Sequence, residues 1–176
     1  MNKLNACLAK ILSGMKPPED LTVSQWADKN RRLTSESSAE VGKWRTSRTP
    51  YMFDILDSFT DPLIEHIVVV AASQVGKSET INNMVGYCID QDPGPILLIQ
   101  PTIDDVKRYS EMRIAPMIRE TRCLKRKVAD PKSRDAANTK RQKSFPGGVL
   151  VMTGSNVAHD LSSMPIRYVF GDERDR

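Results

Sequence analysis

The feature that most constrains the fold is a polar loop between an apolar run and an amphipathic stretch. Ile67–Ala71 is a continuous run of mostly β-branched residues, typical of a strand buried on both faces. The octapeptide AASQVGKS (Ala71–Ser78) follows it and matches the phosphate-loop pattern G-x-x-x-x-G-K-S/T, with Ala at the first position instead of Gly. The apolar residues of Lys77–Ile89 then recur on one helical stripe. This order predicts a strand, a phosphate-binding loop and a helix.

The residue types in this loop suit a nucleotide site. Gly76 allows a close backbone approach, and the N–H groups of the loop and of the helix N-terminus face the phosphates. Lys77 would reach the β- and γ-phosphates, and the Ser78 hydroxyl would ligate Mg²⁺. We therefore expect ATP and Mg²⁺ as cofactors. The expected nucleotide-binding residues are Ser73, Gln74, Val75, Gly76, Lys77, Ser78 and Glu79.

The second half of such a site is an acidic residue at the end of another buried strand. Tyr168–Phe170 is a short apolar run, and Asp172 and Glu173 follow it. Asp172 would hold Mg²⁺ through its water shell, while Glu173 would act as the general base that polarises the attacking water. A Glu beside the metal-binding Asp favours hydrolysis over transfer to a small molecule. Lys77 and Glu173 are thus the predicted catalytic residues.

Strand-like and helix-like stretches alternate along the rest of the chain. Further strands are predicted at residues 96–99, 149–152 and 168–170, and helices at 51–59 and from Thr102 to Pro116, which kinks or ends the latter. The pattern predicts an α/β fold, a P-loop NTPase (RecA-like) parallel sheet flanked by helices. We divide the chain into a lead-in (1–50) and an ATPase domain (51–176). An amphipathic helix within 1–16 either packs on its own domain or docks on a partner.

The positive charge of the chain is concentrated in one segment. Nine basic and two acidic residues between Thr121 and Ser144 give that segment a net charge of +7, against +4 for all 176 residues. Because it lacks apolar periodicity, it is predicted to be a loop. It is either a solvated linker or a sequence-independent contact with a phosphate backbone. The DNA-contact candidates are Lys125, Arg126, Lys127, Lys140, Arg141 and Lys143.

Other features exclude some classes or leave alternatives open. The three cysteines are far apart and have no metal-ligand spacing, which excludes a disulfide scaffold and argues against a zinc site. No apolar run reaches the length of a membrane span. Gln100–Thr102 is either a helix N-cap or a nucleic-acid contact, and Thr153–Asn156 is either a turn or a phosphate contact. His159 is interpreted as a loop residue rather than a catalyst.

An ordered set of motifs resembles the N-terminal part of the large subunit of a double-stranded DNA phage terminase, the lambda-like packaging ATPase. The motifs lie at residues 23–28, 42–46, 49–51, 73–79, 92–95, 100–102, 144–148, 165–168 and 172–173. The resemblance implies an ATPase in the host cytoplasm that powers translocation of double-stranded DNA into the procapsid. It also implies a small terminase subunit as a partner, and contact with the procapsid portal through the full-length protein.

Individual residues also follow from the resemblance. Lys77, Ser78, Asp172 and Glu173 match the family's motifs directly, and Tyr51 lies in its adenine-contact segment. The chain departs from the pattern at three points: the loop carries no Arg, Met52 stands where a Gln is common, and the sequence stops at Arg176. We therefore expect a sheet that is incomplete at its C-terminus and no nuclease in this chain. The alternatives are a truncated module that only binds nucleotide, DNA or a partner, and another P-loop motor such as a helicase.

Overall fold

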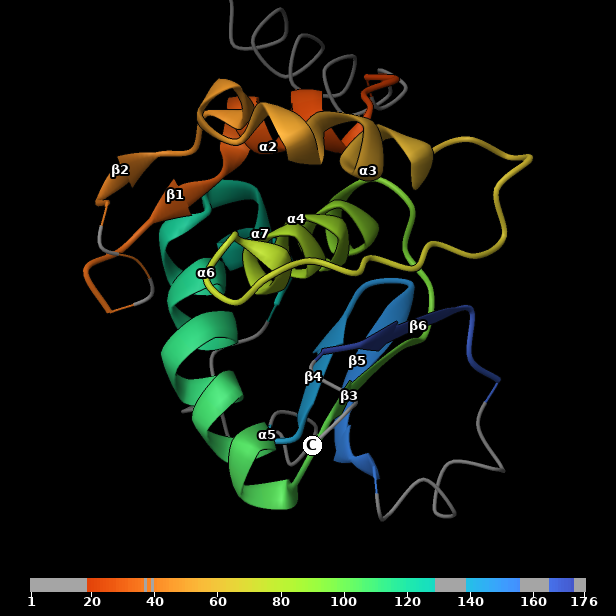
Figure 1. Ribbon diagram of the computed structural model, residues 1–176. Helices are drawn as coiled ribbons and strands as arrows, with labels where there is room; N and C mark the ends of the chain where they lie inside the picture. The colour runs from red at the N-terminus through yellow and green to blue at the C-terminus, as the bar shows by residue number, and fades with distance from the viewer. Residues whose placement is uncertain (1–18, 37, 39, 129–138, 156–164, 173–176) are drawn as a thin grey trace, which may run out of the picture.

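The computed structural model describes residues 19–36, 38, 40–128, 139–155 and 165–172 (Figure 1). The helix predicted within residues 1–16 lies outside these ranges. The helical elements are α2 (Val23–Asn30), η1 (Thr46–Arg48), η2 (Pro50–Met52), α3 (Phe53–Ser58), α4 (Lys77–Asp90), α5 (Ile103–Tyr109), η3 (Ser110–Ile114), α6 (Ala115–Glu120) and α7 (Arg122–Lys127). The strands are β1 (Arg32–Leu33), β2 (Gly42–Lys43), β3 (Ile96–Gln100), β4 (Gln142–Phe145), β5 (Gly148–Gly154) and β6 (Tyr168–Gly171).

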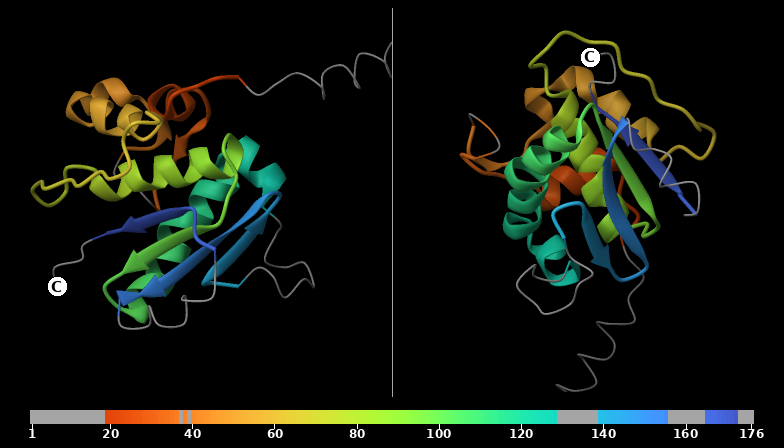
Figure 2. Two further views of the ribbon diagram at one scale, coloured as in Figure 1. Left: turned by 90° about the vertical axis from the view of Figure 1, so that its right-hand side faces the viewer. Right: turned by 90° about the horizontal axis from the view of Figure 1, so that it is seen from below.

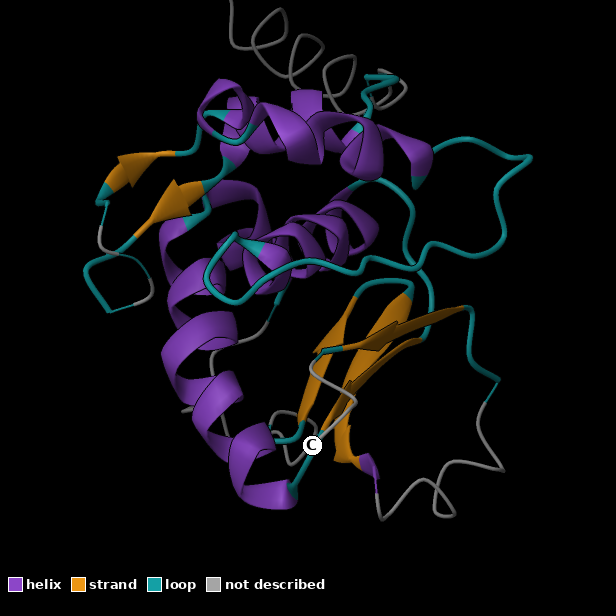
Figure 3. Cartoon of the chain, viewed as in Figure 1, coloured by secondary structure: helices purple, strands orange, loops and turns teal. Residues whose placement is uncertain are grey.

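The described residues form a mixed α/β structure in layers. A four-stranded sheet has the order β4-β5-β3-β6; β3 runs parallel to β5 and β6, and β4 runs antiparallel to β5. Helices α4 to α7 cover the sheet, and α2 and α3 lie over α4 on the side away from it (Figure 2). The core joins all three layers because Trp26, Ile89 and Leu98 belong to one buried cluster. Figure 3 shows how helices and strands segregate.

The predicted strand at Ile67–Ala71 is wrong. This run is extended chain outside the sheet, and Val68 and Val70 are 86% and 94% exposed. A strand exists only when its backbone groups pair with a neighbour, and within the described ranges no other strand lies beside this run. The β-branched composition favours an extended backbone but does not supply that partner.

The other predicted strands are confirmed within one or two residues at their ends. Residues 96–99 lie in β3, residues 149–152 in β5 and residues 168–170 in β6. The helix predicted at Lys77–Ile89 is also confirmed, since it forms all but the last residue of α4. Parallel pairing of β3 with β5 and β6 places the carboxyl ends of these strands at one edge of the sheet.

The prediction of a loop over the whole basic segment is wrong at both of its ends. Its start folds into α7, and its end forms β4, while residues 129–138 lie outside the described ranges. β4 pairs with β5 through a tight turn at Pro146 and Gly147, from Phe145 opposite Gly148. Gly147 has a φ of 87°, which a side chain would make unfavourable, so the Pro-Gly pair explains the turn.

The helix that begins after Thr102 does not end at Pro116. Thr102 caps α5 as predicted, because its side chain accepts a hydrogen bond from the Asp105 amide. The chain then continues through the π-helical segment η3 into α6, where Pro116 lies in the first turn. A π segment shifts the hydrogen-bond register, and the first turn of a helix tolerates a residue without an amide hydrogen.

The lead-in segment (residues 19–50) contains a helix that the sequence analysis did not predict. Thr22 and Gln25 form a reciprocal capping box at the start of α2. Trp26 is fully buried, and its indole nitrogen donates to Asp90 Oδ2 at 2.9 Å. The backbone amide of Ser24 donates to Asp57 Oδ1 at 3.0 Å. These contacts fix α2 to α3 and α4.

Candidate nucleotide-binding site

The phosphate loop (Ala71–Ser78) adopts a backbone that its glycine makes possible. Gly76 caps the start of α4 with a φ of 93°, and Gln74 also has a positive φ of 61°. A non-glycine residue in this region is strained, and such strain is often retained at binding sites. The Lys77 ammonium turns back over the loop and donates to the Ala71 carbonyl oxygen at 2.8 Å. The N-terminus of α4 therefore faces the phosphate loop. The helix dipole and the free N–H groups at this end attract anions.

The structure brings the two predicted halves of the site together. Ser78 Oγ donates to Asp172 Oδ2 at 2.7 Å, although the residues are 94 positions apart in sequence. Asp172 is 6% exposed and follows β6, with its amide bonded to the Ile99 carbonyl oxygen of β3. The parallel sheet thus delivers the acidic residue to the first turn of α4. Glu173, the predicted general base, lies outside the described residues.

The Ser78–Asp172 pair offers oxygen donors of the kind that Mg²⁺ prefers. A hydroxyl and a carboxylate make a small donor set, which suits an ion that keeps several waters and binds substrate phosphates. Within the described ranges, no three His, Cys, Asp or Glu side chains gather into a cluster that could hold a metal by itself. The residues present therefore fit a metal that arrives with a phosphate ligand.

Glu79 is held by two arginines that the sequence analysis missed. Its carboxylate accepts from Arg31 Nη2 at 2.5 Å and from Arg113 Nη1 at 3.2 Å. Arg31 is 1% exposed and also donates to Asn83 Oδ1 at 2.9 Å. Burial lowers the pKa of Arg31, and the negative charge of Glu79 opposes that change. The predicted nucleotide contact Glu79 thus links the lead-in, α4 and η3 in one ion cluster.

A tyrosine buried beneath the loop shares this environment. Tyr109 donates to Asn82 Oδ1 at 2.8 Å, and its hydroxyl lies 3.4 Å from the Ser78 carbonyl oxygen. Burial raises the pKa of Tyr109, and the charges of Asp172 and Glu79 raise it further. The phenol therefore stays neutral, and it positions the first turn of α4 from below.

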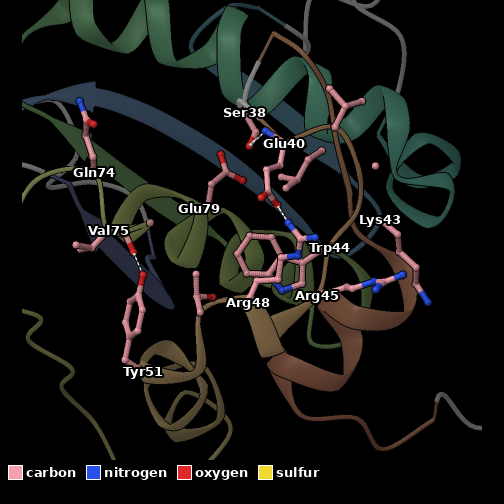
Figure 4. A pocket seen from close by; sticks show the side chains of 15 residues that line it. Ser38, Glu40, Lys43, Trp44, Arg45, Arg48, Tyr51, Gln74, Val75 and Glu79 are labelled. Carbon is pink, nitrogen blue, oxygen red and sulfur yellow. Dashed lines mark hydrogen bonds and ion pairs between the residues drawn. The ribbon is translucent and has the colours of Figure 1, made fainter.

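A hollow of about 720 Å³ lies between the lead-in and the phosphate loop (Figure 4). Tyr51 is 58% exposed, and its hydroxyl donates to the Val75 carbonyl oxygen at 3.1 Å across the mouth of the hollow. Arg48 forms an ion pair with Glu40 on its wall. The volume lies within the range of about 300–1,000 Å³ found for small-molecule pockets. The side chains that line the hollow and carry charge are Glu40, Lys43, Arg45, Arg48 and Glu79.

The basic candidates divide by their surroundings. Lys127 is bound to Asp90 through Oδ1 at 2.9 Å, and Lys140 forms an ion pair with Glu111. Lys143 is buried, its ammonium donates to the Thr139 carbonyl oxygen at 2.7 Å, and burial lowers its pKa. Lys140 is exposed despite its ion pair, and the remaining three basic candidates are also exposed. They are Lys125, Arg126 and Arg141.

The smaller sequence features also have defined places. Thr102 is the N-cap of α5, which confirms that interpretation and leaves the predicted nucleic-acid contact untested. Arg167 lies before β6, at the end opposite Asp172, and donates to Asp92 Oδ2 at 2.7 Å. His159 lies outside the described residues. Across the described ranges, no helix is both long and apolar enough to cross a membrane.

Comparison with known proteins identifies relatives of this chain. Residues 38–176 match the family model for the ATPase domain of the phage terminase large subunit gpA. The terminase large subunit of Escherichia phage lambda is 26% identical over 148 residues, which cover 84% of this chain and 23% of that protein. The terminase large subunit of Enterobacteria phage P21 is 27% identical over 132 residues, covering 75% and 20% respectively.

The chain thus spans about a fifth of the length of the curated relatives it matches. No solved structure matches it with significance. The matched region contains both the phosphate loop and Asp172, so the family assignment and the geometry concern the same residues.

Proposed function

The chain belongs to the family of the phage terminase large subunit gpA, within its ATPase domain, and we propose that it binds and hydrolyses ATP with Mg²⁺ at the phosphate loop. The observation that carries the proposal is the contact between Ser78 and Asp172 at the start of α4. It joins the residue after the P-loop lysine to a carboxylate that follows a parallel strand, and a P-loop NTPase holds Mg²⁺ with such a pair.

Each residue of the site has a defined task in this proposal. The Lys77 ammonium, now bonded to the Ala71 carbonyl, is placed to exchange that acceptor for β- and γ-phosphate oxygens. Ser78 and Asp172 would hold Mg²⁺, which neutralises charge that develops on the phosphates. Glu173 would take the proton of the attacking water. Base and ribose would occupy the hollow beside Tyr51.

We further propose that hydrolysis powers movement of double-stranded DNA into a procapsid, as part of a longer terminase large subunit. The lambda and P21 relatives are named as terminase large subunits, and this chain covers only part of each. The exposed residues Lys125, Arg126 and Arg141 would contact the DNA backbone. A small terminase subunit and the procapsid portal are the proposed protein partners, and the host cytoplasm is the proposed location.

The substitution Lys77→Ala tests nucleotide binding. It removes the ammonium that would contact the phosphates, and a hydrogen bond to a charged group contributes about 1.5–3 kcal/mol, so ATP affinity should fall about 10- to 100-fold. Isothermal titration calorimetry with ATP–Mg²⁺ measures this directly. Lys107→Ala is the matched control, because Lys107 is exposed on α5 and paired with Asp104. Equal affinity in the wild type and Lys77→Ala would contradict the assignment.

A further inference from the structure

One buried amide nitrogen near the site has no hydrogen-bond partner among the described residues. Gln100 ends β3 and is 6% exposed, and no acceptor for its carboxamide nitrogen lies within the described part of the chain. A buried donor without an acceptor costs free energy, so native proteins keep few of them unless another group accepts the bond. Among the described residues Gln100 therefore lacks an acceptor, and a ligand bound at this edge of the sheet would supply one.

The sheet register places Gln100 beside Asp172. β3 pairs with β6 from Ile96 opposite Tyr168 to Ile99 opposite Gly171, so the next position sets Gln100 against Asp172. Side chains alternate between the faces of a strand, which puts Gln100 on the same face as the core residue Leu98. This face is the one covered by the helices, and Figure 1 shows β3 and β6 side by side beneath them.

On the strand at its other side, β5, the neighbour of Gln100 is a glycine. Gly154 of β5 pairs with Gln100, and a Cβ there would lie 3.0 Å from the Ile103 amide nitrogen. Ser155 Oγ donates to the Pro101 carbonyl oxygen at 2.9 Å, which ties the loop after Gln100 to β5. The backbone around Gln100 is thus fixed, and the charged neighbour of its carboxamide on the sheet is the carboxylate that bonds to Ser78.

We propose that the Gln100 carboxamide donates a hydrogen bond to the γ-phosphate of bound ATP. This inference rests on the proposed ATP site, where Lys77 would contact the β- and γ-phosphates and Ser78 and Asp172 would hold Mg²⁺. A donor that lies beside Asp172 at the carboxyl edge of the sheet meets the terminal phosphate of ATP but finds no acceptor in ADP. Gln100 is then a specificity residue that distinguishes the triphosphate from the diphosphate.

Gln100 is directly connected in sequence to the helices that contact the phosphate loop. Pro101 and the cap residue Thr102 follow it directly, and α5 continues into η3, from which Arg113 reaches Glu79. A hydrogen bond between Gln100 and the γ-phosphate would therefore act on the residues that start α5.

The test compares two nucleotides and two substitutions of Gln100 in the whole chain. Calorimetry with Mg²⁺ measures the affinity for ADP and for AMP-PNP, a triphosphate analogue that is not hydrolysed. Gln100→Leu removes the donor, so affinity for AMP-PNP should fall about 10-fold or more while affinity for ADP stays within about twofold. Gln100→Asn keeps the amide but shortens the side chain by one methylene. It should also lower the affinity for AMP-PNP more than the affinity for ADP.

Thr121→Val is the matched control, because the Thr121 hydroxyl is likewise buried without a partner among the described residues and lies at the start of α7, outside the proposed nucleotide site. It should leave both affinities unchanged. Gln100 variants that keep the wild-type ratio, or that lose both nucleotides equally, would overturn the role of Gln100 alone. A wild-type chain that binds neither nucleotide would overturn the ATP site itself, and the role of Gln100 with it.

Discussion

Gly86 of α4 lies against the buried indole of Trp26. A Cβ at position 86 would lie 2.4 Å from Cη2 and 2.9 Å from Cζ3 of the buried indole. Exchanging Gly for Ala inside a helix ordinarily stabilises a protein by about 0.5–1 kcal/mol. Here overpacking should outweigh that gain, and we expect Gly86→Ala to lower the free energy of unfolding by about 1–3 kcal/mol in urea titrations.

A double-mutant cycle separates this clash from a general effect of the substitution. Trp26→Phe shortens the ring system and should relieve part of the cost of Gly86→Ala, so the two changes should be less than additive. Trp26→Phe also removes the hydrogen bond to Asp90. Because that loss occurs in both the single and the double mutant, it cancels in the cycle. A stabilised Gly86→Ala protein would show that α2 does not pack on α4 as described.

How far the sequence predicts a site residue depends on where its partner lies. Gly76, Lys77 and Ser78 stand in one local pattern, and Asp172 follows an apolar run, so both halves could be found and their contact anticipated. Arg31 could not, because nothing local marks an arginine that reaches Glu79 from 48 positions away. Gln100 was predicted only as part of Gln100–Thr102, a helix N-cap or a nucleic-acid contact, since the lack of an acceptor among the described residues becomes visible only in the folded chain.

Strands show the same limit. Ile67–Ala71 has the composition of a buried strand, yet it lies outside the sheet. Strand formation needs a neighbouring strand to pair with, and the composition of a segment does not identify that strand. β4 is the opposite case, since its basic and polar residues suggested a loop. The turn at Gly147 brings it back along β5, and the paired backbone then forms a strand despite that composition. α4 could be predicted because its hydrogen bonds are local and its apolar residues recur on one stripe.

Asp90 ties together α2, α4 and α7. Its carboxylate accepts from Trp26 Nε1 at 2.9 Å and Gln91 Nε2 at 2.8 Å, and it pairs with Lys127 at 2.9 Å. Burial raises the pKa of Asp90, but the hydrogen bonds from Lys127, Trp26 and Gln91 outweigh it, so the pKa lies below its ordinary value. The ionised form therefore stabilises the fold, and protonation weakens these contacts.

The expected pH dependence follows from that sign. A carboxyl with a lowered pKa stabilises the fold above about pH 4, and the contribution is lost as the pH falls through the folded-state pKa. Asp90→Asn should cost about 1.5–3 kcal/mol at neutral pH, and its difference from the wild type should shrink near pH 3. Urea unfolding at both pH values measures this. Asp104→Asn, at a surface ion pair with Lys107, should change little at either pH.

Across the molecule, the basic charge is less available than the sequence suggests. The whole segment from Thr121 to Ser144 carries +7, but Lys143 is buried, and Lys127 and Lys140 are held in ion pairs with Asp90 and Glu111. A polyanion responds to exposed charge, because only such charge displaces its counterions. Lys125 and Arg126 extend from α7 into solvent and are therefore the residues on which the proposed DNA contact depends most.

The double substitution Lys125→Gln/Arg126→Gln tests that contact. If both side chains neutralise phosphates, affinity for duplex DNA should fall on all sequences, and the slope of log K against log salt should become shallower by about 2. Fluorescence anisotropy over a salt series measures both. The control Lys29→Gln/Arg119→Gln removes the same net charge from residues paired with Glu19 and Glu36, and it should leave the slope unchanged. Equal effects of the two pairs would mean that net charge, and not α7, attracts the DNA, whereas an unchanged slope in both would remove α7 from the DNA contact.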